Sequence, residues 1–260
     1  MTVGGVLLDI DGVLTVSWRP LPGAADALAQ LGRQGVPFRL VTNTSSRTRA
    51  EMARLLADAG MEVRAGAVHT AVSAAARHLA EHHAHARVLV VNDGNLRPDL
   101  DGVEVVTEDG GVDVVLLGGA GPATGYAQFD RAFRAVQDGA ALVALHRNTR
   151  FQTADGPALD MGAFLLGIEA ATGVEATIVG KPAAPLFEAA LADLGVPAEK
   201  VLMVGDDIDA DVHGAQALGM TGVLVRTGKF RAADLDAGSP APDHVIDGVS
   251  VLPRLIDELG

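Results

Sequence analysis

The stretch Leu7-Leu8-Asp9-Ile10-Asp11-Gly12-Val13-Leu14-Thr15 places two carboxylates directly after a short apolar run. Residues 5–9 predict a buried strand, and Gly12 allows the chain to turn at once. Because residues i and i+2 of a strand point to the same side, Asp9 and Asp11 are expected to face one point in space. A turn or N-cap aspartate is the alternative for either residue alone. Two acids behind one buried strand repel each other, and a shared cation would relieve that repulsion.

Composition excludes several classes of protein. The chain has 260 residues, 48% of them apolar, which is enough for a hydrophobic core and too apolar for general disorder. Its formal net charge of −13 argues against a nucleic-acid or anionic-membrane partner. No cysteine is present, which excludes disulfides, thiolate metal sites and a cysteine nucleophile. No signal-peptide pattern or membrane-length apolar stretch occurs, so we expect a cytoplasmic protein.

Strand and helix patterns alternate along almost the whole chain. Predicted strands cover residues 5–9, 38–42, 87–92, 112–117, 141–145, 200–204 and 222–225. Predicted helices cover residues 24–34, 48–59, 71–83, 127–137, 162–171, 185–194 and 210–218. Alternation of this kind indicates an α/β fold in which helices cover parallel sheets.

The middle of the chain forms a βα series of its own and lacks an acidic set like that at the strand ends of the rest of the chain. We therefore expect residues 68–176 to be an inserted α/β domain, and residues 1–67 and 177–260 to form a core with a doubly wound parallel sheet. Ligands of such sheets bind at the carboxyl ends of the strands. The functional residues are expected there, on the loops of the core.

Two polar segments belong to this core. The segment Val41-Thr42-Asn43-Thr44-Ser45-Ser46 ends a predicted strand and leads into a helix, whose N-terminal N–H groups suit an anion. Plain N-capping by Ser45 or Ser46 fits equally well. Lys181, in Gly180-Lys181-Pro182, is one of three lysines, a compact cation suited to a phosphoryl group or a carboxylate. A solvated lysine is the alternative.

Four carboxylates follow another apolar strand in the segment Asp206-Asp207-Ile208-Asp209-Ala210-Asp211. A solvated, helix-capping loop is the alternative, and it suits Asp209 best. Asp206 and Asp211 are expected to point back toward the sheet edge. Together the segments supply oxygen ligands for Mg²⁺, a carboxylate nucleophile, a second carboxylate for proton transfer, and groups that bind phosphoryl oxygens.

In this order the four segments resemble the haloacid dehalogenase (HAD) superfamily of phosphatases, with its D-x-D-G-T/V, Thr, Lys and G-D-x-x-x-x-D motifs. The insert resembles the type IIA cap of NagD-like members, and the strings are similar to the phospholysine phosphohistidine inorganic pyrophosphate phosphatase branch. The resemblance implies a Rossmann-like core with an α/β cap. It implies hydrolysis of a small phosphorylated molecule, P–N and pyrophosphate bonds included, and it allows a homodimer through the cap.

The resemblance also implies roles for individual residues. Asp9 would be the nucleophile and a metal ligand, and Asp11 the general acid/base with its backbone carbonyl on Mg²⁺. Asp206 would bind Mg²⁺ and Asp211 would support it, while Asp207 stands where relatives often have Asn or Arg. By the same comparison, the phosphoryl group would be bound by Thr42, Asn43 and Lys181.

Other interpretations fit parts of the sequence. A phospho-accepting receiver module combines similar residues, but it is about half as long and orders its acids differently. An NAD-dependent oxidoreductase is suggested by the glycines of residues 117–125, where the spacing fails at Thr124. A histidine cluster has a metal-capable spacing, but a solvated helix end is the favoured interpretation; its members are His78, His82, His83 and His85. Arg147, Asn148 and Arg150 are candidates for substrate contact or for a solvated loop.

Overall fold

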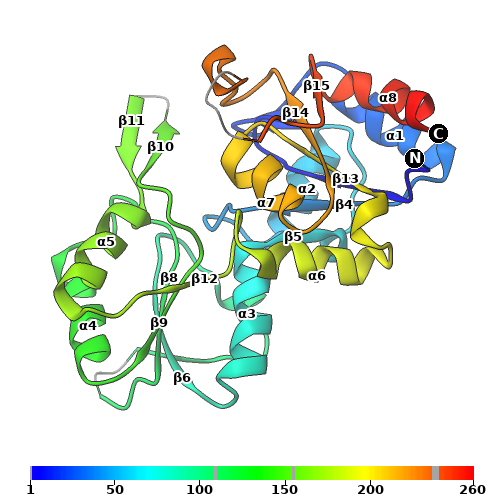
Figure 1. Ribbon diagram of the computed structural model, residues 1–260. Coiled ribbons are helices and arrows are strands. Elements are labelled where there is room, and N and C mark those ends of the chain that lie inside the picture. Colours follow the sequence, from blue (N-terminus) through cyan, green and yellow to red (C-terminus); the bar gives the residue numbers. More distant parts are fainter. Residues whose placement is uncertain (1, 108–109, 154–155, 236–239) are drawn as a thin grey trace. The chain divides into compact units, whose positions relative to one another are not determined.

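The computed structural model describes residues 2–107, 110–153, 156–235 and 240–260. The chain forms two compact units (Figure 1). Unit 1 contains Met1–Thr42, Arg49–His69 and Lys181–Gly260, and unit 2 contains Asn43–Thr48 and Thr70–Gly180. No helix among the described residues is long and apolar enough to cross a bilayer.

Unit 1 is built on a six-stranded sheet in the order β15-β14-β13-β1-β4-β5. Its strands are β1 (Gly5–Leu8), β4 (Phe38–Thr42), β5 (Val68–Thr70), β13 (Val201–Gly205), β14 (Thr221–Val225) and β15 (His244–Ile246). The chain moves outward from β1 to β5, then returns to the other side of β1 and moves outward again to β15. The point where this direction reverses lies between β1 and β13, which pair in parallel with Leu8 opposite Val204.

Helices cover both faces of this sheet. They are α1 (Ala24–Gln34), α2 (Arg49–Asp58), α6 (Ala184–Leu194), α7 (Gly214–Gln216) and α8 (Leu252–Leu259), with the π-helical turn η4 (Ile208–His213) before α7. Side chains of β1 alternate between the two faces, as strand geometry requires. Val6 and Leu8 pack with the apolar residues of α1, α2 and α8, whereas Leu7 packs with those of α6 and α7.

Short elements complete unit 1. The strands β2 (Thr15–Val16) and β3 (Arg19–Pro20) form a small antiparallel hairpin after the first acidic segment. The 3₁₀ turns are η1 (Ala65–Ala67), η3 (Ala198–Lys200), η5 (Ala232–Leu235) and η6 (Val249–Val251).

Unit 2 has a five-stranded parallel sheet in the order β12-β9-β8-β6-β7. Its strands are β6 (Arg87–Val91), β7 (Glu104–Val106), β8 (Val114–Leu117), β9 (Ala141–Ala144) and β12 (Thr177–Ile178). Its helices are α3 (Ala71–His82), α4 (Tyr126–Gln137) and α5 (Met161–Thr172), with the 3₁₀ turn η2 (Arg97–Asp99). A hairpin of β10 (Arg150–Thr153) and β11 (Gly156–Leu159) precedes α5. Stacked rings of Phe129 and Phe164 join α4 to α5.

The predicted α/β class with a doubly wound parallel sheet is confirmed. Each of the seven predicted strands is present within a few residues of its predicted bounds. The prediction missed the short strands β2, β3, β5, β7, β12 and β15, of two or three residues each, the four-residue strands of the β10–β11 hairpin, and the helix α8. The predicted helix 210–218 is instead the turn η4 followed by α7. The close approach of Gly214 to Pro182 and Phe187 accompanies this irregular winding.

The two units divide at other residues than the predicted domains. Asn43–Thr48 belongs to unit 2, although it lies within the predicted core range 1–67. Strand β12 lies within the predicted core range 177–260, but it pairs with β9 of the unit 2 sheet. The backbone hydrogen bonds of β12 decide which sheet it joins, and such bonds leave no pattern in side-chain hydrophobicity.

The edge strand β5 is joined to α6 by a polar contact within unit 1. His69 Nε2 lies 3.1 Å from Asp193 Oδ2, and Arg39 of β4 binds the same carboxylate through its Nε. Arg39 also donates from Nη2 to the Asp193 backbone oxygen at 2.9 Å. Burial lowers the pKa of His69, and this effect outweighs the opposing attraction of Asp193.

This contact predicts a pH dependence of stability. Because the pKa of His69 is lower in the folded chain than in the unfolded one, the unfolded chain binds more protons as pH falls below about 6.5. We expect the free energy of unfolding, measured in urea between pH 7.5 and 5.5, to decrease less steeply in His69→Gln than in the wild type. The control is His85→Gln, which replaces an exposed histidine. If the free energy of unfolding of His69→Gln changed with pH as steeply as that of the wild type, the prediction would be contradicted.

Candidate active site

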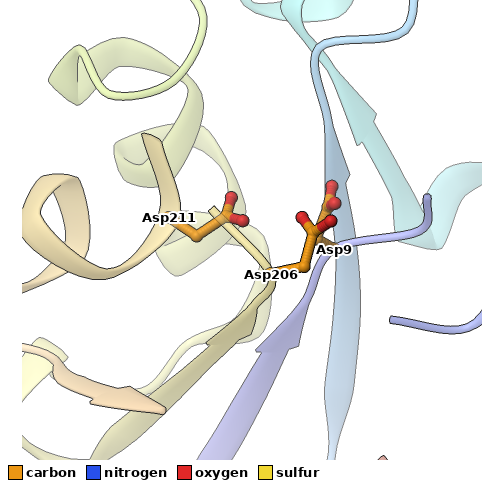
Figure 2. Close-up of side chains that lie close together, drawn as sticks. All are labelled: Asp9, Asp206 and Asp211. Atoms are coloured by element: carbon orange, nitrogen blue, oxygen red, sulfur yellow. The ribbon is translucent and has the colours of Figure 1, made fainter. Parts of the chain in front are cut away.

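The sheet topology brings the first and fourth acidic segments together. Asp9 follows β1, Asp206 follows β13, and the two strands are parallel neighbours on either side of the switch point. The Asp9 N–H donates to the Val204 carbonyl at 2.9 Å, which continues the ladder to the strand end. Ligands of open α/β sheets bind at this position. Asp211 in η4 completes what we call the acidic cluster, Asp9, Asp206 and Asp211 (Figure 2).

Two glycines make room for these carboxylates. Gly12 has a φ of +93°, and a β-carbon there would overlap the Asp206 carboxylate. A β-carbon at Gly205 would likewise overlap the side chain of Asp211. Any other residue at either position would displace an acid of the cluster. The glycines of the pairs Asp11-Gly12 and Gly205-Asp206 therefore allow the backbone to pack directly against carboxylates of the cluster.

Lys181 lies between two members of the acidic cluster. Its Nζ donates to Asp9 Oδ1 at 2.7 Å, to Asp211 Oδ1 at 2.6 Å and to the Val41 carbonyl at 3.3 Å. The lysine is 4% exposed, and Asp9 and Asp211 are 7% and 1% exposed. These are buried, charge-assisted hydrogen bonds, in which each ion compensates for the hydration that its partner has lost.

Burial and repulsion between like charges raise the pKa values of two carboxyls in the cluster. Burial and the neighbouring Asp9 and Asp211 raise the pKa of Asp206 to about 8. Burial raises the pKa of Asp211 to about 6, although Lys181 opposes the change. Burial disfavours the ammonium of Lys181, but Asp211 and Asp9 outweigh it and raise its pKa. When all three acids are ionised, the ammonium leaves the cluster with two excess negative charges.

The donor set fits a divalent cation. Oxygen atoms of Asp9, Asp206 and Asp211 all lie within 4.8 Å of one another. Asp206 Oδ1 is buried and has no hydrogen-bond partner in the part of the chain that the structure describes. Buried carboxylate oxygens without a partner are costly, and hard divalent cations such as Mg²⁺ prefer oxygen ligands. Asp206 Oδ1 is therefore the atom best prepared to bind a metal.

Other predicted residues have different surroundings. Asp11 is exposed outside the acidic cluster, and its Oδ1 accepts a hydrogen bond from the Ser17 N–H at 3.1 Å. Thr42 is buried at the carboxyl end of β4, the strand that pairs with β1 on the side away from β13. Asn43 begins the unit 2 segment Asn43–Thr48 and belongs to that unit. The roles of these three residues stay predictions.

The surroundings of Asp207 show a capping role. Its Oδ1 accepts from the N–H groups of Asp209 and Ala210, at 3.2 and 3.0 Å, and so caps η4. Its Oδ2 pairs with Lys229 Nζ at 3.2 Å. Sequence reasoning had overlooked Lys229, whose backbone N–H donates to Asp206 Oδ2 at 2.7 Å. Lys229 lies just after the predicted strand 222–225, which ends at the same sheet edge as the strand before Asp206. This position could have indicated that Lys229 lies near the site.

Comparisons with known proteins cover nearly the whole chain. Residues 6–106 match the family Haloacid dehalogenase-like hydrolase, and residues 178–252 match the family HAD-hydrolase-like. The Haloacid dehalogenase-like hydrolase domain-containing protein 2 of Bos taurus is 38% identical over 237 residues, which are 91% of this chain and 89% of the relative. The chain belongs to the haloacid dehalogenase-like hydrolases.

Other relatives of this HAD-family protein are phosphatases. The Phospholysine phosphohistidine inorganic pyrophosphate phosphatase of Bos taurus is 34% identical over 254 residues, 95% of this chain and 92% of that one. The p-nitrophenyl phosphatase from Archaeoglobus fulgidus has a TM-score of 0.91 and 29% identity, covering 98% of this chain and 100% of that chain. NagD from E. coli K-12 has a TM-score of 0.86 and 28% identity, covering 96% and 98%. The protein is a HAD phosphatase of type IIA, related to the phospholysine phosphohistidine inorganic pyrophosphate phosphatase branch.

Two further sequence candidates belong to unit 2. The His78 ring packs against those of His82 and His83 at the end of α3, with centroids 4.6 and 5.7 Å away. Among the described residues, the acidic cluster is the one group with metal-binding geometry. Arg147 is held in unit 2 by two hydrogen bonds to Glu169, at 2.8 and 2.7 Å.

The Lys181 pair predicts a large effect on stability. In Lys181→Met, Asp9 and Asp211 lose their buried counter-charge, and we expect the free energy of unfolding to fall by about 3–5 kcal/mol at pH 8 in EDTA. Urea denaturation measures this change. The matched control is Lys200→Met, which replaces an exposed lysine and should change stability by less than about 0.5 kcal/mol. Equal effects of the two substitutions would contradict the prediction.

Proposed function

We propose that this HAD phosphatase depends on Mg²⁺ and hydrolyses a small phosphorylated molecule through a phosphorylated Asp9. The buried acidic cluster at the switch point, joined by Lys181, is the observation that carries the proposal. Mg²⁺ would be held by carboxylate oxygens of Asp9 and Asp206 and by the Asp11 backbone carbonyl. When bound, it would neutralise charge on the transferring phosphoryl group.

In the first step, a carboxylate oxygen of Asp9 attacks phosphorus. The bond between phosphorus and the leaving atom breaks as the Asp9–phosphoryl bond forms, and Asp11 gives its proton to that leaving atom. Lys181 holds Asp9 through Oδ1, to which its Nζ donates at 2.7 Å. The lysine thus orients the nucleophile and places a positive charge beside the site of reaction.

In the second step, the Asp11 carboxylate accepts a proton from water as the water oxygen attacks phosphorus. The bond between phosphorus and Asp9 breaks, inorganic phosphate leaves, and Asp9 is free again. Thr42 and Asn43 would bind phosphoryl oxygens during both steps. Asp211 would support the site by holding Lys181, to which it is bound at 2.6 Å.

The substrate class follows from the relatives and from charge. The names of two relatives include p-nitrophenyl phosphate, phosphoramidate and pyrophosphate substrates. We infer a small phosphorylated molecule, with P–O, P–N and P–O–P bonds as candidates. The net charge of −13 disfavours nucleic acid and anionic membranes as partners. A cytoplasmic location and a homodimer through unit 2 are part of the same proposal.

The nucleophile is tested by Asp9→Asn. We expect kcat for p-nitrophenyl phosphate to fall by at least about 10³-fold, because an amide cannot form the phosphorylated intermediate. Circular dichroism should show an intact fold. The control is Asp209→Asn, an exposed acid outside the acidic cluster, which should keep wild-type activity. Near-full activity in Asp9→Asn would refute the mechanism.

Metal dependence is tested by removal and return of the ion. After dialysis against EDTA, we expect phosphate release to fall to background, because no cation would then offset the negative charge of the cluster and of the substrate. Added Mg²⁺ should restore the rate in a saturable manner. Full activity in the presence of EDTA would contradict the metal requirement while leaving the fold and family unaffected.

A further inference from the structure

The loop of residues 226–230 contacts the acidic cluster and the turn at Gly12. It lies outside the four sequence segments in which site residues were predicted. It follows β14, the strand beside β13, and therefore emerges at the same carboxyl edge as Asp206. Three consecutive residues of this loop contact the segments that carry Asp206 and Gly12. Thr227 does so through its hydroxyl, Gly228 through its backbone, and Lys229 through its backbone N–H.

Gly228 lies where two segments of the site meet. Its φ is +63°, and a β-carbon there would overlap the Asp206 carboxylate and lie 2.6 Å from Gly12 Cα. Gly12 itself has no room for a β-carbon, because the same carboxylate lies against it. The Asp206 carboxylate is therefore held between two glycine backbones that come from loops 216 positions apart in the sequence.

Lys229 fixes one oxygen of that carboxylate. Its backbone N–H donates to Asp206 Oδ2 at 2.7 Å. Oδ1, the buried oxygen without a hydrogen-bond partner among the described residues, is left for a cation. Rotation of the carboxylate would exchange the two oxygens, and this hydrogen bond opposes the rotation. The backbone of Lys229, rather than its ammonium, therefore sets the orientation.

Thr227 binds the backbone of the turn at Gly12. Its Oγ1 donates to the Gly12 carbonyl at 2.5 Å. The Gly12 N–H in turn donates to the Thr15 carbonyl at 2.6 Å, so the turn that follows Asp9 and Asp11 is bound on both sides of Gly12. A single loop thus restrains the chain that carries both aspartates of the first segment and also the carboxylate of Asp206.

We propose that Thr227, Gly228 and Lys229 are positioning residues of the metal site. They hold the Asp206 carboxylate and the Gly12 turn at the separation that a divalent cation requires, and they leave Asp206 Oδ1 as the ligand atom. Groups that orient metal ligands without touching the ion commonly change metal affinity by about 10–100-fold when they are removed. The inference rests on the proposed Mg²⁺ site and adds three residues to it.

The test measures metal binding directly, with isothermal titration of Mg²⁺ into the metal-free full chain. We expect Gly228→Ala to weaken binding by about 10–100-fold, because its methyl group displaces the Asp206 carboxylate. The matched control is Gly219→Ala. Gly219 also has a positive φ, +82°, but no atom lies within 4 Å of its β-carbon position, so this variant carries the backbone strain alone. It should bind Mg²⁺ within about twofold of the wild type.

A second pair of variants avoids backbone strain. Thr227→Val removes the hydroxyl that binds the Gly12 carbonyl, and Thr227→Ser keeps it. We expect weaker Mg²⁺ binding in Thr227→Val, by about tenfold, and recovery in Thr227→Ser. This pair decides the matter if Gly228→Ala does not fold, which thermal unfolding would show.

The outcomes separate the inference from the proposed function. Wild-type Mg²⁺ affinity in folded Gly228→Ala, or equal affinities of Thr227→Val and the wild type, would overturn the positioning role even if the wild type hydrolyses substrate normally. Absence of Mg²⁺ binding by the wild type would overturn the metal site itself. Binding that follows the expected order, together with no hydrolysis by the wild type, would support the inference and refute the proposed reaction.

Discussion

The structure depends on one buried ion pair network, in which the Lys181 ammonium binds Asp9 and Asp211. Each of these charges has left water, and the short hydrogen bonds among them offset part of that loss. The network is also unbalanced, because Asp206 adds a third carboxylate and its pKa is raised to about 8. These buried carboxylates supply the oxygen donors and the negative charge that a divalent cation would complement.

Parallel-sheet topology makes this concentration of charge possible. At the switch point, the chain leaves β1 toward β4 and β13 toward β14, and the ends of β1 and β13, which Asp9 and Asp206 follow, lie side by side. Main chain and carboxylates approach so closely here that side chains are excluded at Gly12, Gly205 and Gly228. These glycines allow backbone atoms to contact the carboxylates. The acidic cluster thus depends on close packing of main chain as much as on its three acids.

Much of the fold was predictable because its longer elements carry strong patterns. Strand β1 is buried on both faces, and a continuous apolar run predicts such a strand well. The hydrogen bonds that place β12 in the unit 2 sheet depend on backbone position and leave no trace in residue type. Residue type also left the role of Asp207 open, and the structure shows that its carboxylate caps η4 and pairs with Lys229.

The sequence by itself determined the α/β class, the acidic strand ends and the resemblance that led to the family, because these are properties of local pattern and of residue type at fixed spacing. Only the tertiary structure decided which acids meet. It brought Asp211 to Lys181, separated the exposed Asp11 from the buried cluster, and placed Gly228 against Asp206. These contacts join residues far apart in the chain, and their distances arise from sheet register and packing, which no local pattern encodes.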